Sequence, residues 1–247
     1  TKESGAIRTT DNNGADRANV AIARNRAPIN KLFERKGVDF SEPIFMRAIK
    51  DESVIELWAK AKRRDGYRLV KSYEICNYSG ELGPKTKQGD LQTPEGFYQV
   101  QPWHMKPNSD FHLAFNLGFP NPHDRARGWT GSHLMVHGDC FSEGCFAMRD
   151  GPMEEIYTVA TMNFEAGHGA FNFHSFPFRL TEKKLAAAKD HPWHGFWLAM
   201  QPGFKLFERE KRVPQIATNG GAYVASLPLK PQEIGKVSQL GSQKGRY

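Results

Sequence analysis

Three apolar segments between residues 44 and 75 alternate with short polar turns, and this pattern limits the possible folds more than any other feature. The segments IFMRAIK, VIELWAK and YRLVKSYEI have the length and the β-branched and aromatic content of strands. The turns between them are Asp51-Glu52 and Asp65-Gly66, and Asp-Gly is typical of a two-residue hairpin. Further strands are predicted at 97–100, 112–117 and 133–136. We therefore expect a mainly β body.

Helices are predicted on both sides of this body. A polar lead-in covers residues 1–41, with a weak helix near Asp16–Asn25 and then a short amphipathic helix that Pro28 opens and Gly37 ends. Three helices are expected after the last strand, and the second of them begins at Thr181, a residue type favoured at N-caps. The pattern predicts a mostly β fold of the α+β class with helices appended to it.

The chain shows no internal repeat. We expect one domain of catalytic size over residues 42–210. The last segment, 211–247, is rich in proline and glycine, and we expect it to be an irregular extension.

The charge balance is basic but scattered, with 34 lysines and arginines against 27 acidic residues. A solvated surface explains it, as does an anionic partner such as an envelope polymer. No zinc-finger spacing or arginine-rich helix points to nucleic acid. No apolar run approaches the roughly 18–20 residues of a transmembrane helix. No signal-like apolar segment follows the N-terminus, so an exported protein would already have lost its signal peptide.

The three cysteines, at positions 76, 140 and 145, leave at least one thiol free. A bridge between Cys76 and Cys140 with Cys145 free would suit an oxidising compartment. Three reduced cysteines would suit the cytosol equally well. The count alone does not decide between them.

A histidine and a cysteine flank one short polar loop. His137 ends an apolar strand, Gly138 permits a sharp bend, and the chain returns to Gly144 and Cys145. A thiol with a pKa near ~8.5 is a poor nucleophile at neutral pH unless an imidazole lies beside it. Gly144 lets a substrate carbonyl approach backbone N–H groups that can stabilise an oxyanion. The pattern indicates a cysteine nucleophile with a histidine base.

Other interpretations stay open at this point. A lone Cys145 is commonly a buried structural residue. His133 and His137 would face the same side of a strand about 13 Å apart, too far for one tetrahedral metal ion, so we expect no metal and no cofactor. A cysteine peptidase of another fold would place its cysteine at the start of a helix. A non-catalytic envelope-binding module would lack the base or the nucleophile.

Ordered motifs extend on both sides of this pair. They are Tyr-Ser-Gly-x-Leu-Gly-Pro at 78–84, Gly-Asp-x-x-x-Pro-Glu-Gly-Phe-Tyr at 89–98, Phe-Asn-Leu-Gly-aromatic-Pro-Asn at 115–121, and Asp124-Arg125. With His137-Gly138 and Ser142-x-Gly-Cys145, they resemble the L,D-transpeptidase (YkuD) catalytic domain family, and within it the YafK-like branch. The resemblance covers residues 42–210 and implies an L,D-transpeptidase-like β-sandwich or barrel.

The resemblance implies a role for each motif residue. Cys145 would be the nucleophile and His137 the general base and acid, with the Gly138 carbonyl orienting the imidazole. Ser142 and Gly144 would shape the loop and the oxyanion pocket. Further substrate-binding candidates are Tyr78, Tyr98, Arg125, Trp129 and Arg149.

One position departs from the family pattern. Many members carry arginine two residues after the cysteine, where this sequence has Ala147, and Arg149 lies two positions further on. Cations needed for stem-peptide carboxylates are also available at Lys85 and Lys87. A solvated surface is the default reading of each of these charges.

The activity implied by the resemblance is acyl transfer in the bacterial cell wall. Cys145 would attack the diaminopimelate carbonyl of a peptidoglycan stem peptide and form a thioester. The branch favours hydrolysis of the bond between murein and an outer-membrane lipoprotein. The alternative is a transferase that crosslinks stem peptides or attaches proteins to them. The implied setting is the periplasm of a Gram-negative envelope, in cell-wall biogenesis and cell shape.

Overall fold

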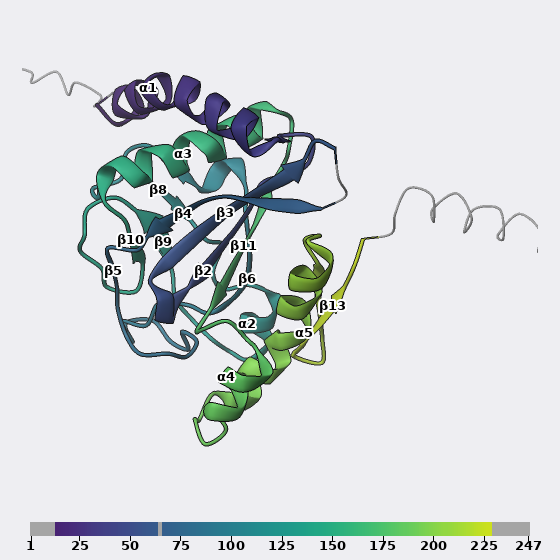
Figure 1. Ribbon diagram of the computed structural model, residues 1–247. Coiled ribbons are helices and arrows are strands. Elements are labelled where there is room, and N and C mark those ends of the chain that lie inside the picture. Colours follow the sequence, from purple (N-terminus) through teal and green to yellow (C-terminus); the bar gives the residue numbers. More distant parts are fainter. Residues whose placement is uncertain (1–12, 64–65, 229–247) are drawn as a thin grey trace, which may run out of the picture.

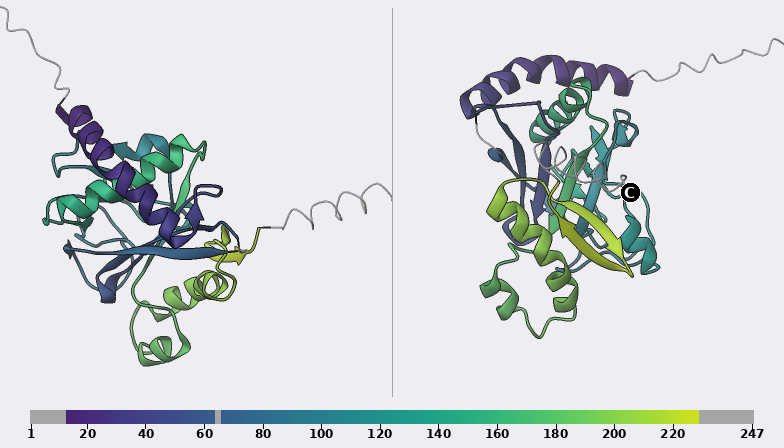
Figure 2. Two further views of the ribbon diagram at one scale, coloured as in Figure 1. Left: turned by 45° about the horizontal axis from the view of Figure 1, so that its top comes forward. Right: turned by 90° about the vertical axis from the view of Figure 1, so that its right-hand side faces the viewer.

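The chain is represented by a computed structural model that describes residues 13–63 and 66–228 (Figure 1). Two β-sheets pack face to face around one core. Helices α1 and α3 cover one end of the pair, and α4 and α5 lie at the other end (Figures 1 and 2). The α+β class predicted from the sequence is confirmed. No helix in the described ranges is long and apolar enough to cross a membrane.

The first sheet, called sheet A here, contains the predicted strands of residues 44–75. Its strand order is β1-β3-β2-β11-β6, and β4 also pairs with β3. Strands β2, β3 and β4 form an antiparallel meander, while β11 runs parallel to β2. The strands are β1 Val38–Asp39, β2 Phe45–Ile49, β3 Val54–Ala61, β4 Tyr67–Glu74, β6 Gly96–Val100 and β11 Phe171–Phe176.

The second sheet, sheet B, has the order β5-β10-β9-β8-β7. Its central pair, β9 and β10, is parallel, and the neighbouring pairs are antiparallel. The strands are short: β5 Asn77–Tyr78, β7 Met105–Lys106, β8 Ala114–Asn116, β9 Met135–His137 and β10 Phe146–Ala147. Short helical turns join the strands: η1 Lys50–Glu52, η2 Pro102–His104 and α2 Pro122–Ala126.

Alternate residues of the two sheets fill the space between them, as the two-residue period of strands requires. The helix α3, Asp150–Glu165, adds Ile156 and Ala160 to the same core. Fully buried residues of the sheets include Met46, Leu57, Phe115, Val136 and Phe173. The neighbouring residues of each strand therefore face outward. Each sheet thus presents an outer face on the opposite side of the sandwich.

The N-terminal helix is longer than the sequence predicted. Helix α1 runs without a break from Asn13 to Lys36 with Pro28 inside it, where a weak helix near Asp16–Asn25 and a separate short helix opened by Pro28 were expected. Pro28 is exposed, so the carbonyl that loses its N–H partner can be hydrated instead. The buried side continues across the proline through Ala21, Ile29 and Phe33 and lies on α3 (Figure 2). Residues 1–12 of the expected lead-in lie outside the described part.

Two helices precede the C-terminal extension. Helix α4, Glu182–Ala187, is capped by Thr181 as predicted and leads to α5, His194–Glu210.

The C-terminal extension is also more regular than expected. It contains a hairpin, with β12 Gln215–Asn219 and β13 Ala222–Ser226. Gly220 and Gly221 take φ values of +55° and +77° at its two-residue turn, which suits glycine. The part of the extension beyond residue 228 lies outside the described residues.

Candidate active site

Cys145 lies where β9 and β10 run side by side. Phe146 pairs with Val136 and Ala147 with His137, so one step back along the parallel register places Cys145 beside Met135. The contact agrees, because the Met135 N–H donates to the Cys145 Sγ at 3.4 Å. Val136 and Phe146 point into the core, and Cys145 and His137 therefore share the outer face of sheet B. They are separated by two residues, about 7 Å along the strands.

The thiol is half-buried and held by backbone groups. Besides accepting from Met135, Sγ donates to the His133 carbonyl at 3.4 Å. Burial raises the pKa of the Cys145 thiol, against the opposing effects of the Met135 N–H and the Lys85 cation. The resting sulfur is therefore a protonated thiol at neutral pH, and it needs a base to become a nucleophile.

His137 is oriented for the role of that base. Its Nδ1 lies 2.5 Å from the Gly138 carbonyl, which can only accept, so Nδ1 carries the proton and Nε2 keeps a free lone pair. Burial lowers the pKa of His137, although Gly138 and Asp139 act in the opposite direction. Phe111 packs on the imidazole with ring centres 4.9 Å apart. The ring is thus neutral and held in one tautomer.

The backbone of Cys145 is fixed by two hydroxyl groups. The Ser142 hydroxyl donates to the Cys145 carbonyl at 2.8 Å and accepts its N–H at 3.1 Å. The Thr93 hydroxyl donates to the same carbonyl at 3.2 Å. Gly144 is buried with φ +117°, in the region that favours glycine. Ser142 and Gly144 thus shape the loop in the way the motif implies.

A disulfide fastens the same loop to the neighbouring strand. Cys76 and Cys140 are bonded, and Cys145 is the free cysteine, so the first of the two arrangements left open by the sequence is the one found. Cys76 also donates its N–H to the Ala147 carbonyl, next to the catalytic strand. The bond therefore ties both sides of the His-Cys loop together.

Loss of this bond is expected to lower stability. The cysteines are 64 residues apart, and a cross-link over such a loop contributes about 2–4 kcal/mol by restricting the unfolded chain. The Cys76→Ser/Cys140→Ser protein should lose that free energy of unfolding in urea denaturation, and wild type in reductant should lose the same amount. A difference below about 0.5 kcal/mol between oxidised wild type and the double variant would contradict this account.

Of the five further candidates, only Tyr78 lies beside the catalytic strand. It pairs with Phe146 across β5 and β10, and the Lys50 ammonium lies 5.6 Å from its ring centre. Tyr98 is a core residue, 2% exposed, and donates to the Glu95 carbonyl at 3.0 Å. The structure therefore gives Tyr98 a packing role and no place at the outer face of sheet B.

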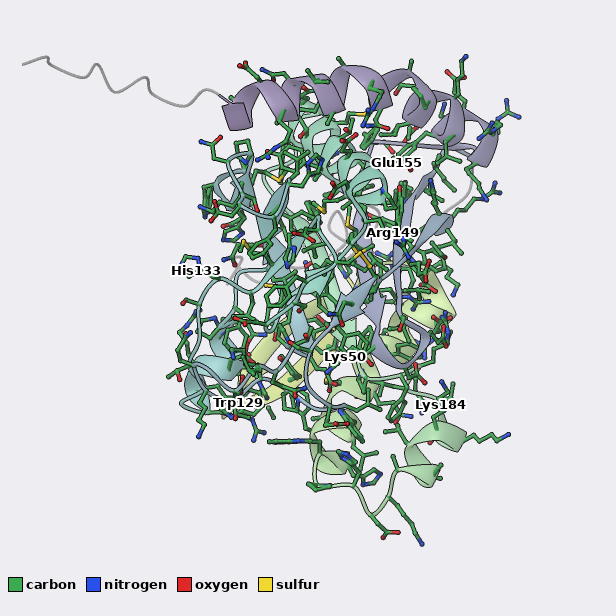
Figure 3. The ribbon with its side chains drawn as sticks, turned by 90° about the vertical axis from the view of Figure 1, so that its left-hand side faces the viewer. Lys50, Trp129, His133, Arg149, Glu155 and Lys184 are labelled. Atoms are coloured by element: carbon green, nitrogen blue, oxygen red, sulfur yellow. A yellow bond between two sulfur atoms is a disulfide. The ribbon has the colours of Figure 1, made fainter. Side chains whose placement is uncertain are left out.

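Arg125, Trp129 and Arg149 are not brought together. Arg125 is on α2 and donates to the Pro120 carbonyl. Trp129 packs edge-on against Trp193 at 6.2 Å, and Arg149 is the exposed residue that precedes α3. In the view of Figure 3, Trp129 and Arg149 lie apart and in different directions from His133, whose carbonyl holds the thiol. Of the two arginines, Arg149 is nearer to Cys145 in the sequence, and its side chain is exposed.

A buried ion pair beneath the site was missed from the sequence. Lys50 and Glu95 are both fully buried and 3.0 Å apart. The Lys50 ammonium also donates to the carbonyls of Glu81, Gly83 and Thr93 at 2.9–3.2 Å. Burial lowers the pKa of Lys50, and Glu95 opposes that effect. The pair holds the 79–95 loop in place, including Thr93, which touches the Cys145 carbonyl.

Lys85 is a second cation of the site. It is 3% exposed and forms an ion pair with Asp90, whose carboxylate also accepts the N–H groups of Thr86 and Lys87. Its charge favours the thiolate form of Cys145. The sequence named Lys85 only as one of several cations. Its burial and pairing mark it as part of the framework around the thiol.

No group of three histidine, cysteine or acidic side chains in residues 13–63 and 66–228 is arranged to hold a metal ion.

The parallel pair β9 and β10 brings the His-Gly and Ser-x-Gly-Cys segments side by side in sheet B. Residues 50–166 match the L,D-transpeptidase catalytic domain, and the chain belongs to this family. It is 37% identical over 215 residues to YafK of Escherichia coli K12, covering 87% of this chain and 86% of that protein, and equally to YafK of strain O157:H7.

Solved structures show a more distant similarity. The helical cell shape determining protein Pgp2 of Campylobacter jejuni (K307A mutant) aligns with 16% identity and a TM-score of 0.46, over 83% of this chain and 80% of that one. Bd1075 of Bdellovibrio bacteriovorus aligns with 14% identity and a TM-score of 0.40, over 72% and 77%.

Proposed function

We propose that this protein is a periplasmic cysteine enzyme that cleaves peptidoglycan stem peptides at diaminopimelate through a thioester on Cys145. The favoured reaction is hydrolysis of the bond between murein and an outer-membrane lipoprotein. Membership of the L,D-transpeptidase family supports the substrate class. The Cys76–Cys140 disulfide supports an oxidising compartment.

One observation carries the proposal. A half-buried thiol and an imidazole with a free Nε2 lie on the same outer face of adjacent parallel strands. The short contact between Nδ1 and the Gly138 carbonyl fixes the tautomer, so the basic nitrogen is available to the substrate side. A cysteine with only a packing role needs neither a half-exposed sulfur nor an oriented base.

The reaction follows from these groups. Nε2 of His137 takes the Cys145 proton as Sγ attacks the diaminopimelate carbonyl carbon, and the oxygen becomes an oxyanion that the backbone N–H groups near Gly144 stabilise. The oxyanion collapses, the carbon–nitrogen bond breaks, and His137 returns the proton to the leaving amine. A water molecule, deprotonated by His137, then attacks the thioester. The acid product leaves and Sγ regains its proton.

The second substrate separates hydrolysis from transfer. Both outcomes share the Cys145 thioester, and an amine in place of water would give a new peptide bond. Purified protein should therefore be incubated with lipoprotein-bearing sacculi, and separately with a tetrapeptide and an amine. Free lipoprotein and a shortened muropeptide are expected from the first mixture. A crosslinked product from the second, with no release from the first, would replace hydrolysis by transpeptidation. No reaction in either would contradict the proposal.

The resting protonation state gives a test without substrate. Since burial raises the pKa of Cys145 and lowers that of His137, thiol and imidazole are both neutral at pH 7. Alkylation of Cys145 by iodoacetamide should rise with pH and reach half its maximum above about pH 9, the ordinary value for a thiol. Cys145 is the free cysteine, so alkylated mass reports it directly. A plateau already present between pH 5 and 7 would instead indicate a preformed thiolate–imidazolium pair.

A further inference from the structure

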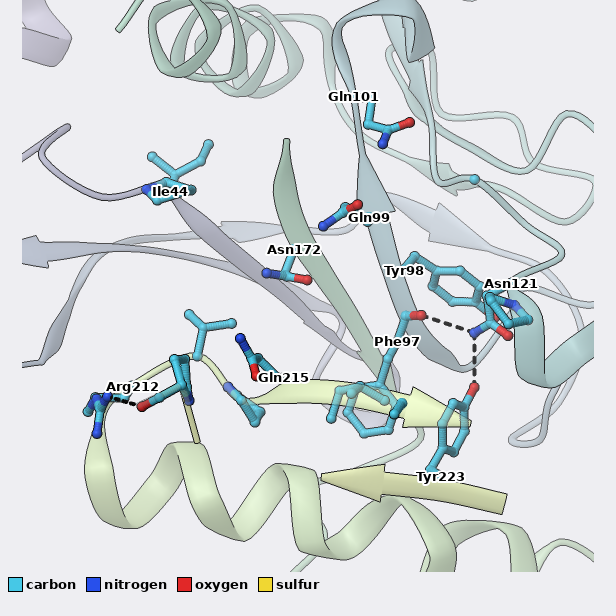
Figure 4. A pocket seen from close by; sticks show the side chains of 18 of the residues that line it. Ile44, Phe97, Tyr98, Gln99, Gln101, Asn121, Asn172, Arg212, Gln215 and Tyr223 are labelled. Atoms are coloured by element: carbon cyan, nitrogen blue, oxygen red, sulfur yellow. Dashed lines mark hydrogen bonds between the residues drawn. The ribbon is translucent and has the colours of Figure 1, made fainter. Parts of the chain in front are cut away.

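A hollow lies on the other side of the sandwich from Cys145. It has a volume of about 1280 Å³, and it opens between the outer face of sheet A and the β12–β13 hairpin (Figure 4). Asn172 faces it because Phe171 and Phe173, its neighbours on β11, point into the core, and Gln99 pairs with Asn172 across β6 and β11. Ligand pockets for single small molecules have volumes of about 300–1,000 Å³, so this groove has room for a longer ligand.

Neutral carboxamides project into this groove from both walls. Gln99 on β6 and Asn172 on β11 are directly opposite across the strands, and Gln215 on β12 faces them from the hairpin (Figure 4). Within residues 13–63 and 66–228, none of these three side-chain amides has a hydrogen-bond partner. The nearby Asn121 differs, since its amide donates to the Phe97 carbonyl and the Tyr223 hydroxyl at 3.0 Å each.

The charged residues of the lining are already engaged or acidic. Arg212 donates to the Pro228 carbonyl at 2.5 Å, Arg125 to that of Pro120, and Lys60 also has an interaction partner. Glu42 is the one carboxylate among the described lining residues. The groups that are open to a ligand are therefore mainly neutral amides, each with two donors and one acceptor.

This set of groups selects one kind of ligand. Hydroxyl and acetamido groups both donate and accept, so they satisfy carboxamides on both sides. An apolar ligand would leave the amides without partners at a cost of about 1–3 kcal/mol each. Rings of Tyr67, Phe97 and Tyr223 add apolar surface for the carbon–hydrogen faces of sugar rings. We propose that the groove binds an oligosaccharide of N-acetylated amino sugars, in a site separate from the Cys145 chemistry.

The test is a titration of the whole chain with chitotetraose, followed by calorimetry and by amide NMR shifts. Saturable binding is expected, and the Gln99→Ala/Asn172→Ala protein should bind about tenfold more weakly because two hydrogen-bonding side chains are lost. The matched control is Asn219→Ala, at the exposed hairpin turn outside the groove lining, which should bind like wild type. Unchanged melting temperatures show that the variants are folded.

The binding measurement tests this inference independently of enzymatic activity. Absence of saturable binding, or equal affinity in wild type and the double variant, would exclude it. Binding of a free stem peptide at the same residues in place of the sugar would also exclude it. The Cys145→Ala protein should bind chitotetraose as wild type does, because the groove is separate from the thiol. Wild-type protein that binds chitotetraose but gives no product from sacculi or from tetrapeptide and amine would contradict the proposed reaction and leave this inference standing.

Discussion

The Cys145→Ala protein is expected to fold normally and to lose turnover by at least about 10³-fold. Cys145 is the free cysteine, and the proposed thioester requires its sulfur. Its loss removes only two long hydrogen bonds, to Met135 and His133, from a half-buried position. The melting temperature should stay within a few degrees of wild type. Release of lipoprotein from sacculi, followed by mass spectrometry, measures the activity.

A neighbour in the same loop supplies the control. Glu143 is exposed and has no hydrogen-bond or ion-pair partner among the described residues, so Glu143→Ala should keep activity within about threefold of wild type. Equal losses in the two variants would mean that the loop and not the sulfur is responsible. Activity of Cys145→Ala above a few per cent of wild type would remove Cys145 from the mechanism.

The Lys50→Met protein is expected to lose about 3–5 kcal/mol of unfolding free energy. Methionine fills the space but leaves the Glu95 carboxylate buried without its cation, together with three carbonyls that lose their donor. Activity of the folded fraction should fall as well. The Thr93 carbonyl is one of the three that lose their donor, and the Thr93 hydroxyl binds the Cys145 carbonyl. Denaturation in urea measures the stability.

Lys71→Met is the matched control for this effect. Lys71 also pairs with a glutamate, Glu155, but both side chains are about a third exposed, and such surface pairs contribute about 0–1 kcal/mol. Adding Glu95→Gln to Lys50→Met should restore part of the lost stability, since the uncompensated charge is removed. A loss below about 1 kcal/mol for Lys50→Met would show that the ion pair does not hold the loop.

The strands, and the placement of His137 and Cys145 on adjacent segments, could be predicted from the sequence because their signals are local. The strand segments of residues 44–75 carry a period of two, and His137-Gly138 and Gly144-Cys145 lie on either side of one short loop. Because β9 and β10 pair in parallel, His137 and Cys145 lie on the same face of sheet B. The resemblance to the L,D-transpeptidase family limited the expected reaction to acyl transfer, and membership of this family is confirmed.

Two regular elements were missed although their signals were present. Pro28 suggested the start of a helix, but apolar residues recur at helical spacing on both sides of it, and an exposed proline is tolerated inside α1. Gly220-Gly221 was assigned to an irregular extension, yet it separates two alternating five-residue runs, which is the pattern of a two-residue hairpin.

The contacts beneath the site could not be read from the sequence at all. Lys50 and Glu95 are 45 positions apart, and each looks like an ordinary surface charge until the fold buries both. The positions of the substrate-binding candidates could not be predicted for the same reason. Tyr98 faces the core and Trp129 joins an aromatic cluster with Trp193, because the side to which a residue points depends on sheet register and loop path.

A carbapenem tests the central claim most directly, because its strained lactam carbonyl offers Cys145 an acyl group that it releases slowly. Intact mass spectrometry after incubation should show one added carbapenem mass on wild type and none on Cys145→Ala, and peptide mapping should place it on Cys145. An unmodified protein under the same conditions, or an adduct on any residue other than Cys145, would contradict the thioester mechanism.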